Sequence, residues 1–239
     1  MSALFVFEHE LNELNEFNEL GTMKKIMFND RYGLTRKVLS GCKTQTRRII
    51  PDIEIDWVRR GKVHLPVGGY ENGVLFMDVR SILHDAGISD YPAPAKYQPK
   101  YEKGEEIAVA QCYEDAILDV GEEEWNKQHK WYCIENLRKR AGLHNKMFVC
   151  PDLMPHRIKI TDIRLQRLNN ISDEECMREG VVKWMDCYIV AGIMENRGRN
   201  NVCFDTPREA FAALIDRING KGTWESNPWV FAYTFELLR

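Results

Sequence analysis

The sequence predicts an α+β fold, a small mixed β-barrel with helices around it, and two strands and two helices support that prediction. Residues 157–168 alternate apolar and polar side chains with one irregularity near Asp162, which indicates a bulged strand with one wet face. Residues 229–238 place aromatic and aliphatic side chains at every second position, as a second long strand would. Short helices at 172–179 and 206–218 each begin with a capping box, and the second also has proline at its first position.

Shorter or less regular segments complete the predicted elements. Gly41 is expected to end a helix, and Asn72-Gly73 is typical of a two-residue hairpin turn. Residues 122–140 are polar with scattered aromatic side chains, and they predict a helix that ends at Gly142. The other elements predicted are strands at 24–29 and 105–112 and a helix at 31–40.

The chain of 239 residues is long enough for one domain with insertions. Residues 1–22 include the low-complexity run EHELNELNEFNEL, whose period of three fits neither a helix nor a strand, and they are interpreted as a tail. A single folded domain is expected to cover residues 23–239. Two segments within it, at about 51–101 and 115–150, are interpreted as insertions.

Composition restricts the possible partners and location. The net charge of −3 argues against a protein that binds nucleic acid through its overall charge, so such binding would need a local basic groove. No apolar run reaches the roughly 18 residues that a membrane-spanning helix needs, and no basic stretch precedes an apolar run at the N-terminus. A cytoplasmic protein without a membrane partner is therefore expected.

The seven cysteines predict neither a metal site nor a disulfide framework. They show no C-x-x-C spacing, and no histidine pair completes a zinc pattern. They are expected to be reduced thiols, several of them buried. Because a glycine-rich phosphate loop is also missing from the sequence, no metal and no cofactor is implied.

The segment 41–50, Gly-Cys-Lys-Thr-Gln-Thr-Arg-Arg-Ile-Ile, is the most informative about function. One lysine, two threonines and two arginines stand within six positions, soon after the glycine that ends the predicted helix. Several cationic donors and two hydroxyls on so short a segment suit an anionic or carbonyl-bearing ligand. The alternative interpretation is a solvated basic turn.

Several motifs follow one another in an order that is typical of a known family. A predicted helix leads into Gly41-Cys42-Lys43-Thr44, and an arginine follows at Arg47. The later motifs are Met154-Pro155, the segment 171–175 leading to Glu179-Gly180, and Trp224 with Asn227-Pro228-Trp229. In this order they resemble the ASCH domains, relatives of the PUA RNA-binding fold, and more narrowly the long ASCH proteins of bacterial prophages and phages. The resemblance covers about residues 24–50 and 102–239, and it implies a PUA-like barrel.

The chain departs from the family pattern after Gly104. There the prophage proteins usually carry a tryptophan and then Val-Arg-Glu, whereas this chain has Ala108-Val109-Ala110-Gln111. Either the contribution of the Arg-Glu pair is missing here, or Gln111 replaces it as a neutral hydrogen-bonding group in the ligand site.

The smallest ASCH proteins include amidohydrolases that remove the acetyl group from N4-acetylcytidine. The resemblance implies that the catalytic residues here would be Lys43, Thr46 and Glu179. A threonine hydroxyl needs a base to take its proton, and a lysine can be that base only when burial and nearby cations favour its neutral form. Arg47 and Arg48 would supply those cations and bind an oxyanion, while Glu179 would pass a proton to the leaving amine.

The preferred interpretation is a protein that binds RNA or a modified nucleotide or nucleoside without chemistry. PUA-like domains hold RNA in a cleft beside the first helix, where the resemblance places the basic segment. Arg157, Lys159 and Arg164 would extend a basic path, and strand alternation puts the first two on one face. Trp131 and Tyr132 either stack bases or pack their own helix down.

The predicted contacts and the remaining alternative complete the hypothesis. The residues assigned to ligand or nucleic-acid binding are Thr44, Arg47, Arg48, Gln111, Arg157 and Asn227. Asn227 also stands before a proline, where it is expected to shape a turn. A third possibility, a phage assembly or accessory protein, depends only on the genomic setting of the family that the chain resembles.

Overall fold

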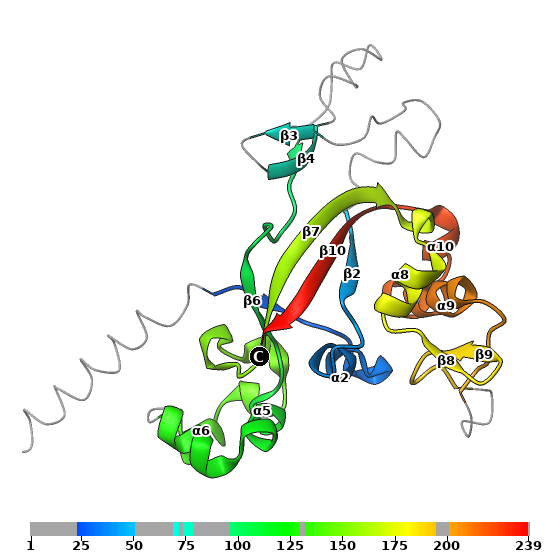
Figure 1. Cartoon of the computed structure of the whole chain (residues 1–239). Coiled ribbons are helices and arrows are strands. Elements are labelled where there is room, and N and C mark those ends of the chain that lie inside the picture. Colours follow the sequence, from blue (N-terminus) through cyan, green and yellow to red (C-terminus); the bar gives the residue numbers. More distant parts are fainter. Residues whose placement is uncertain are drawn as a thin grey trace, which may run out of the picture. The chain divides into compact units, whose positions relative to one another are not determined.

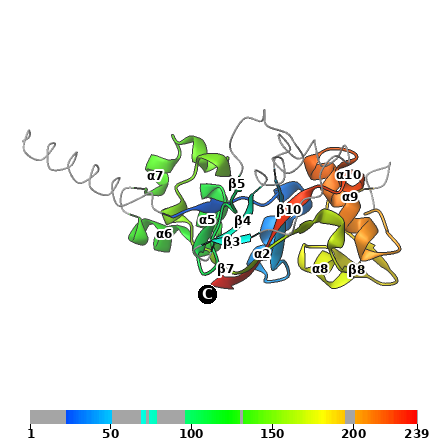
Figure 2. The same ribbon diagram turned by 90° about the horizontal axis from the view of Figure 1, so that it is seen from above.

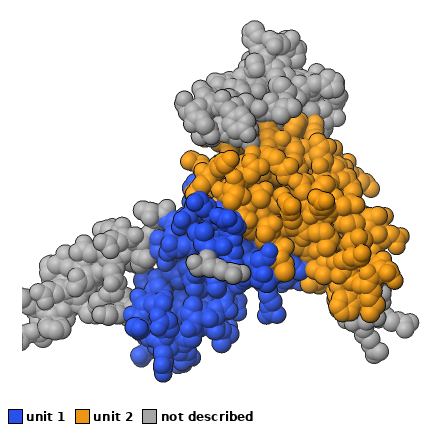
Figure 3. Space-filling model, in the orientation of Figure 1, with its two compact units in different colours: residues 1–41, 106–159, 236–239 blue, residues 42–105, 160–235 orange. Residues whose placement is uncertain are grey.

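The computed structural model describes residues 23–50, 69–71, 74–78, 96–129, 132–194 and 201–238. The chain divides into two compact units (Figure 3). The first comprises Met1–Gly41, Glu106–Lys159 and Glu236–Arg239, and the second comprises Cys42–Glu105 and Ile160–Phe235. Both units combine helices with strands, so the predicted α+β class is confirmed. The predicted tail at 1–22 and most of the predicted insertion at 51–101 lie outside the described residues.

In the first unit, three strands are hydrogen-bonded in the order β1-β6-β7, and the last two are labelled in Figure 1. β1 (Lys25–Ile26) runs parallel to β6 (Glu106–Val109), and β6 runs antiparallel to the start of β7 (Arg157–Arg167). The strand predicted at 24–29 is shorter than expected, because the chain turns into a helical element soon after its second paired residue. The pairing is therefore mixed, as the fold class requires.

The helix predicted at 31–40 is split in two. A 3-10 turn, η1 (Asp30–Tyr32), comes first, and Gly33 then takes a left-handed conformation with φ 62° that ends it. Only after this residue does α2 (Leu34–Leu39) begin. Gly41, with φ 74°, follows the helix in the left-handed region that glycine tolerates best, so the predicted end of the helix is confirmed.

The segment from Tyr113 to Leu153 supplies most of the apolar core of the first unit. The helix predicted at 122–140 is wrong as one element, because α6 (Glu122–Gln128) and α7 (Ile134–Leu137) are separate. Trp125 of α6 is fully buried, and its ring nitrogen donates to the carbonyl oxygen of Tyr132 at 2.8 Å. That an insertion occupies 115–150 stays a prediction, but the segment is not a surface addition to the first unit.

The remaining elements of the first unit are helical. The sequence did not predict α5 (Tyr113–Val120), which begins at the N-cap residue Cys112. The others are the 3-10 helices η2 (Ala141–Leu143), η3 (Lys146–Phe148) and η4 (Pro151–Leu153).

In the second unit, the order of the paired strands is β7-β10-β2. β10 (Trp229–Leu238) runs antiparallel to β2 (Gln45–Ile49), with Ala232 opposite Arg47. Along β7 the apolar side chains Ile158, Ile160, Ile163 and Leu165 are buried, and two half-buried residues at Thr161-Asp162 interrupt the alternation, which confirms the predicted irregularity. The described strands of neither unit close into the predicted barrel.

Two capped helices of the second unit confirm the sequence prediction. α8 (Asp173–Arg178) and α9 (Pro207–Asn219) each begin with a complete capping box, and proline occupies the first turn of α9. The two helices lie side by side in both views (Figures 1 and 2). Among the described residues, no helix is both long and apolar enough to span a membrane.

The second unit also contains hairpins and short helical turns. β3 pairs antiparallel with β4 so that Glu71 stands opposite Val74, as the predicted two-residue turn requires. The bounds of these elements are β3 (Gly69–Glu71), β4 (Val74–Asp78), β5 (Lys96–Tyr97), η5 (Leu168–Asn170), β8 (Val182–Trp184), β9 (Cys187–Ile189) and α10 (Thr223–Ser226).

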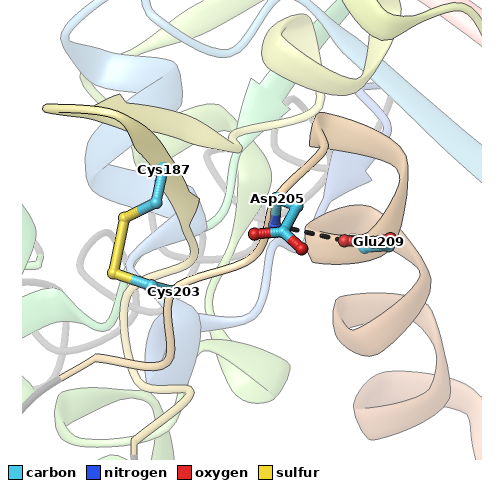
Figure 4. The surroundings of a disulfide bond; sticks show 4 residues. All are labelled: Cys187, Cys203, Asp205 and Glu209. Carbon is cyan, nitrogen blue, oxygen red and sulfur yellow. Dashed lines mark hydrogen bonds between the residues drawn. A yellow bond between two sulfur atoms is a disulfide. The ribbon is translucent and has the colours of Figure 1, made fainter.

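A disulfide joins Cys187 to Cys203 in the second unit (Figure 4). It connects β9 to the segment that leads into α9, where the Asp205 amide donates to a Glu209 carboxylate oxygen at 3.1 Å. The expectation that all thiols are reduced is therefore wrong for this pair. The other five cysteines are free thiols.

Candidate functional site

Lys43 is buried at the centre of a cluster of charged side chains in the second unit. Its ammonium group is within hydrogen-bond distance of three oxygens: the backbone oxygen of Gln45 at 2.7 Å, the backbone oxygen of Glu179 at 2.8 Å and the Glu179 carboxylate at 2.7 Å. Only 2% of the Lys43 surface and 4% of the Glu179 surface is exposed. The two predicted site residues, 136 positions apart in the sequence, therefore meet in space.

The end of α8 explains why these residues meet. Glu179 is the C-cap residue of α8, where the last carbonyl oxygens of a helix lack partners within the helix. The Thr44 amide donates to the Arg178 carbonyl oxygen at 3.0 Å, and Lys43 donates to the Glu179 carbonyl oxygen. A cation at a helix C-terminus is also favoured by the helix dipole. The basic segment thus docks on α8 through its backbone and its ammonium group together.

Arg47 adds a second cation to the same carboxylate. Its guanidinium donates to Glu179 at 2.9 Å and to Glu175 at 2.7 Å. Gln45 precedes Arg47 by two positions on β2, which puts both side chains on one face of the strand. The Nε atom of Arg47 is buried without a hydrogen-bond partner among the described residues.

Glu175 and Arg164 also belong to the cluster, although the sequence did not predict either as a residue of the catalytic site. Glu175 accepts from Arg47, from Arg164 of β7 and from the Ser172 amide that it caps. Glu175 and Glu179 stand four positions apart, a spacing that brings two side chains to one face of a helix. That spacing was the available signal in the sequence for a paired carboxylate site.

Ion pairs join all the charges of the cluster. Three cations, Lys43, Arg47 and Arg164, face the carboxylates of Glu175 and Glu179, and Arg164 also pairs with Asp162 at 3.6 Å, so cations and carboxylates are equal in number. Burial opposes the ionised form of Glu179, but the charges and hydrogen bonds of Lys43 and Arg47 outweigh it and lower the pKa of that carboxyl. Burial also lowers the pKa of Lys43, with Arg48 and Arg47 acting in the same direction against Glu179. Glu179 is therefore held ionised, and Lys43 holds its proton less firmly than a solvated lysine does.

We expect the stability of the protein to fall in acid because of these carboxyl groups. A carboxyl whose pKa is lower in the folded than in the unfolded state stabilises the fold above the unfolded value of about 4.5, and this contribution is lost as the pH falls through the folded value. Free energies of unfolding measured from neutral pH into the acid range should decrease, and Glu179→Gln should show a shallower decrease. An equally steep decrease in the variant would contradict the assignment.

Thr46 and Arg48 alternate to the other face of β2 from Gln45 and Arg47. Thr46 is buried and stands opposite Tyr233 of β10, whereas Arg48 is exposed. Burial raises the pKa of Tyr101 to about 12, and the charge of Arg48 acts against that rise. Strand alternation therefore separates the predicted nucleophile Thr46 from the face that carries Arg47.

Asn227 shapes the turn before β10, as predicted. Its backbone is left-handed with φ 46°, and its side-chain oxygen accepts from the Asn169 amide at 2.8 Å. Its carbonyl oxygen accepts from Arg167 at 3.1 Å. These contacts give Asn227 a structural role; a ligand contact at this residue stays a prediction.

Gln111 and Arg157 lie in the first unit, not in the unit that holds Lys43. Lys159 also belongs to the first unit, so the predicted basic path does not continue through one compact unit. Tyr132 is buried and packs within the core of the first unit, while Trp131 lies outside the described residues.

Neither a metal site nor a known relative identifies the cluster. In the part of the chain that the structure describes, no three His, Cys, Asp or Glu side chains gather so that they could hold a metal ion. Compared with family models, with curated proteins and with solved structures, the chain has no match. The resemblance to ASCH domains stays a prediction.

Proposed function

We propose that the chain is an ASCH-type, PUA-like protein whose second unit binds RNA or a modified nucleoside or nucleotide at Lys43, Arg47 and Glu179. The observation that supports this is the burial of three charged side chains in one cluster, those of Lys43, Arg47 and Glu179. Buried ion pairs can often be replaced by apolar side chains without loss of stability, so stability alone does not explain why a chain keeps one. Strongly perturbed, buried charges gather more often at functional sites.

The donors and acceptors of the cluster suit a nucleobase. The Nε of Arg47, which has no hydrogen-bond partner among the described residues, favours a carbonyl or phosphate oxygen. The carboxylate of Glu179 accepts from Lys43 and Arg47, and its remaining lone pairs can accept from an amino group of a base. A cytosine-like edge presents an amino group and a carbonyl oxygen on neighbouring atoms, so cytidine derivatives are the preferred ligand class.

The test is a titration of the protein with cytidine, N4-acetylcytidine, uridine and a short single-stranded RNA. Ligand-observed NMR measures the binding of each ligand. Arg47→Lys keeps the charge but loses the planar fork and Nε, so we expect affinity to fall at least about tenfold, or about 1.4 kcal/mol. Lys183→Ala, at an exposed position of β8, is the matched control and should bind as the wild type does. No binding to the wild type, or equal binding by Arg47→Lys, would refute the proposal.

The second candidate function is hydrolysis of N4-acetylcytidine, which the lowered pKa of Lys43 favours. Lys43 would take the proton of Thr46, the threonine oxygen would attack the acetyl carbon, and the bond to N4 would break as the amine is protonated. Water would then hydrolyse the acyl-threonine and release acetate. In the structure the ammonium group of Lys43 donates hydrogen bonds to three oxygens. The reaction therefore requires a rearrangement of the cluster that directs this group to Thr46.

Acetate release measures this reaction directly. If Thr46 is the nucleophile, Thr46→Val should abolish acetate release from N4-acetylcytidine, and Thr44→Val, a nearby half-buried threonine, should retain it. Equal rates for the wild type and Thr46→Val would exclude Thr46 as the nucleophile. Absence of release from the wild type at high protein concentration would exclude this substrate and leave the binding function intact.

A further inference from the structure

The first unit contains a cleft of about 850 Å³. Its volume falls within the range of small-molecule sites, which measure roughly 300–1,000 Å³. All of the lining residues belong to the first unit. They come from η1 and α2, from α5 and from the residues next to β6 and β7: Asp30, Gly33, Thr35, Arg36, Leu39, Ser40, Gln111, Asp115, Leu118, Asp119 and His156.

Gln111 lines the cleft and has a buried acceptor without a partner among the described residues. Its side-chain nitrogen donates to the Asp119 carboxylate at 2.6 Å, and only 5% of the residue surface is exposed. A carboxylate can only accept hydrogen bonds, so the amide of Gln111 must turn its NH₂ group toward Asp119. Its carbonyl oxygen is then left buried with no hydrogen-bond partner among the described residues. A donor on a ligand would satisfy it.

The ionised groups around the cleft favour a positive ligand. Asp119 also accepts from His156 at 3.2 Å, which fixes the carboxylate from two sides. Asp30 pairs with Lys146 at 2.6 Å, while Asp115 adds a further exposed carboxylate. Because Lys146 neutralises Asp30, the two carboxylates of Asp115 and Asp119 remain against one lining side chain with a permanent positive charge, Arg36.

We propose that this cleft binds a small organic molecule that carries a protonated amine or amidine. The N–H groups of such a cation donate to the Gln111 carbonyl oxygen and lie near the carboxylates of Asp115 and Asp119. The leucine side chains at 39 and 118 offer apolar contact to the rest of the molecule. A bare metal ion fits less well, since the described part of the chain gathers no three side chains of the metal-binding types. This site belongs to the first unit, whereas the proposed nucleoside site belongs to the second, and the two sites prefer ligands of opposite charge.

The experiment is a titration of ¹⁵N-labelled full-length protein with benzamidine and benzylamine. Benzyl alcohol and benzoate are matched neutral and anionic probes of similar size. We expect saturable shifts of the Gln111 side-chain amide and of backbone amides around the cleft with both cations, and at least about tenfold weaker binding of the neutral and anionic probes. Equal binding of all four probes, or no saturable shift with either cation, would overturn the proposal.

Two variants test the groups that carry the proposal. Asp115→Asn removes an exposed charge without changing the size of the side chain, and Gln111→Leu removes the buried carbonyl oxygen. Each should weaken benzamidine binding several-fold, and unchanged binding by both would contradict the site. The control is Arg47→Lys, which changes the nucleoside site in the other unit and should leave benzamidine binding as in the wild type. Since each ligand is titrated separately, failure of one site does not hide the other.

Discussion

Replacing Glu179 by alanine is expected to lower the free energy of unfolding by about 3–5 kcal/mol. The substitution leaves the ammonium of Lys43 buried without a carboxylate, and it removes one acceptor of the Arg47 guanidinium. An uncompensated buried charge costs far more than the pair itself contributes. Chemical denaturation followed by circular dichroism measures the loss.

Two further variants separate this effect from a general weakness of α8. Glu174→Ala, at an exposed position of the first turn, should cost no more than about 1 kcal/mol. The double variant Lys43→Met with Glu179→Leu removes both charges of the pair, and its stability should lie within about 2 kcal/mol of the wild type. A Glu179→Ala variant as stable as Glu174→Ala would show that the buried pair does not form.

Replacing Trp125 by alanine is expected to cost about 3–5 kcal/mol, because the side chain is fully buried in the core of the first unit. The substitution removes the hydrogen bond to the Tyr132 carbonyl oxygen and the edge-to-face contact with Tyr113, whose ring centre lies 6.1 Å away. Denaturation under the same conditions measures the loss.

The matched control is Trp184→Ala, which truncates a tryptophan that is 56% exposed. This variant should stay within about 0.5 kcal/mol of the wild type. A loss below about 1 kcal/mol for Trp125→Ala would indicate that the segment around it is peripheral to the fold, as an insertion at 115–150 can be.

Elements whose signals are local could be predicted from the sequence. The capping boxes at Ser172 and Thr206 place the starts of α8 and α9 without help from tertiary contacts. The alternation in β7 and β10 likewise depends on which residues are apolar, and even the irregularity at Asp162 is visible in the sequence.

Elements that depend on tertiary packing were predicted poorly. The composition of 122–140 suggested one polar helix, whereas the chain leaves the helical conformation at His129, and both Trp125 and Tyr132 are buried in the core of the first unit. An odd number of cysteines without motif spacing gave no sign of the pair Cys187–Cys203, since the chain brings them together only through the fold.

In the candidate site, too, some residues could be predicted from the sequence and others depend on tertiary packing. Lys43 and Glu179 were assigned together from a resemblance, and the structure brings their side chains within 2.7 Å. Glu175 was predicted only as a helix cap. Its ion pairs with Arg47 and Arg164 depend on two strands, and the sequence does not place these strands beside α8. Strand alternation separates Thr46 from Arg47 on β2, a separation that the resemblance by itself does not indicate.

The most direct test of a functional role for the cluster is the titration of N4-acetylcytidine and cytidine into the Lys43→Met, Glu179→Leu double variant. This variant keeps the fold if the pair can be replaced by apolar side chains, so a loss of binding reports on the site and not on unfolding. We predict that the wild type binds at least one of these nucleosides and that the folded double variant binds neither. Binding of equal strength by both proteins would contradict the account.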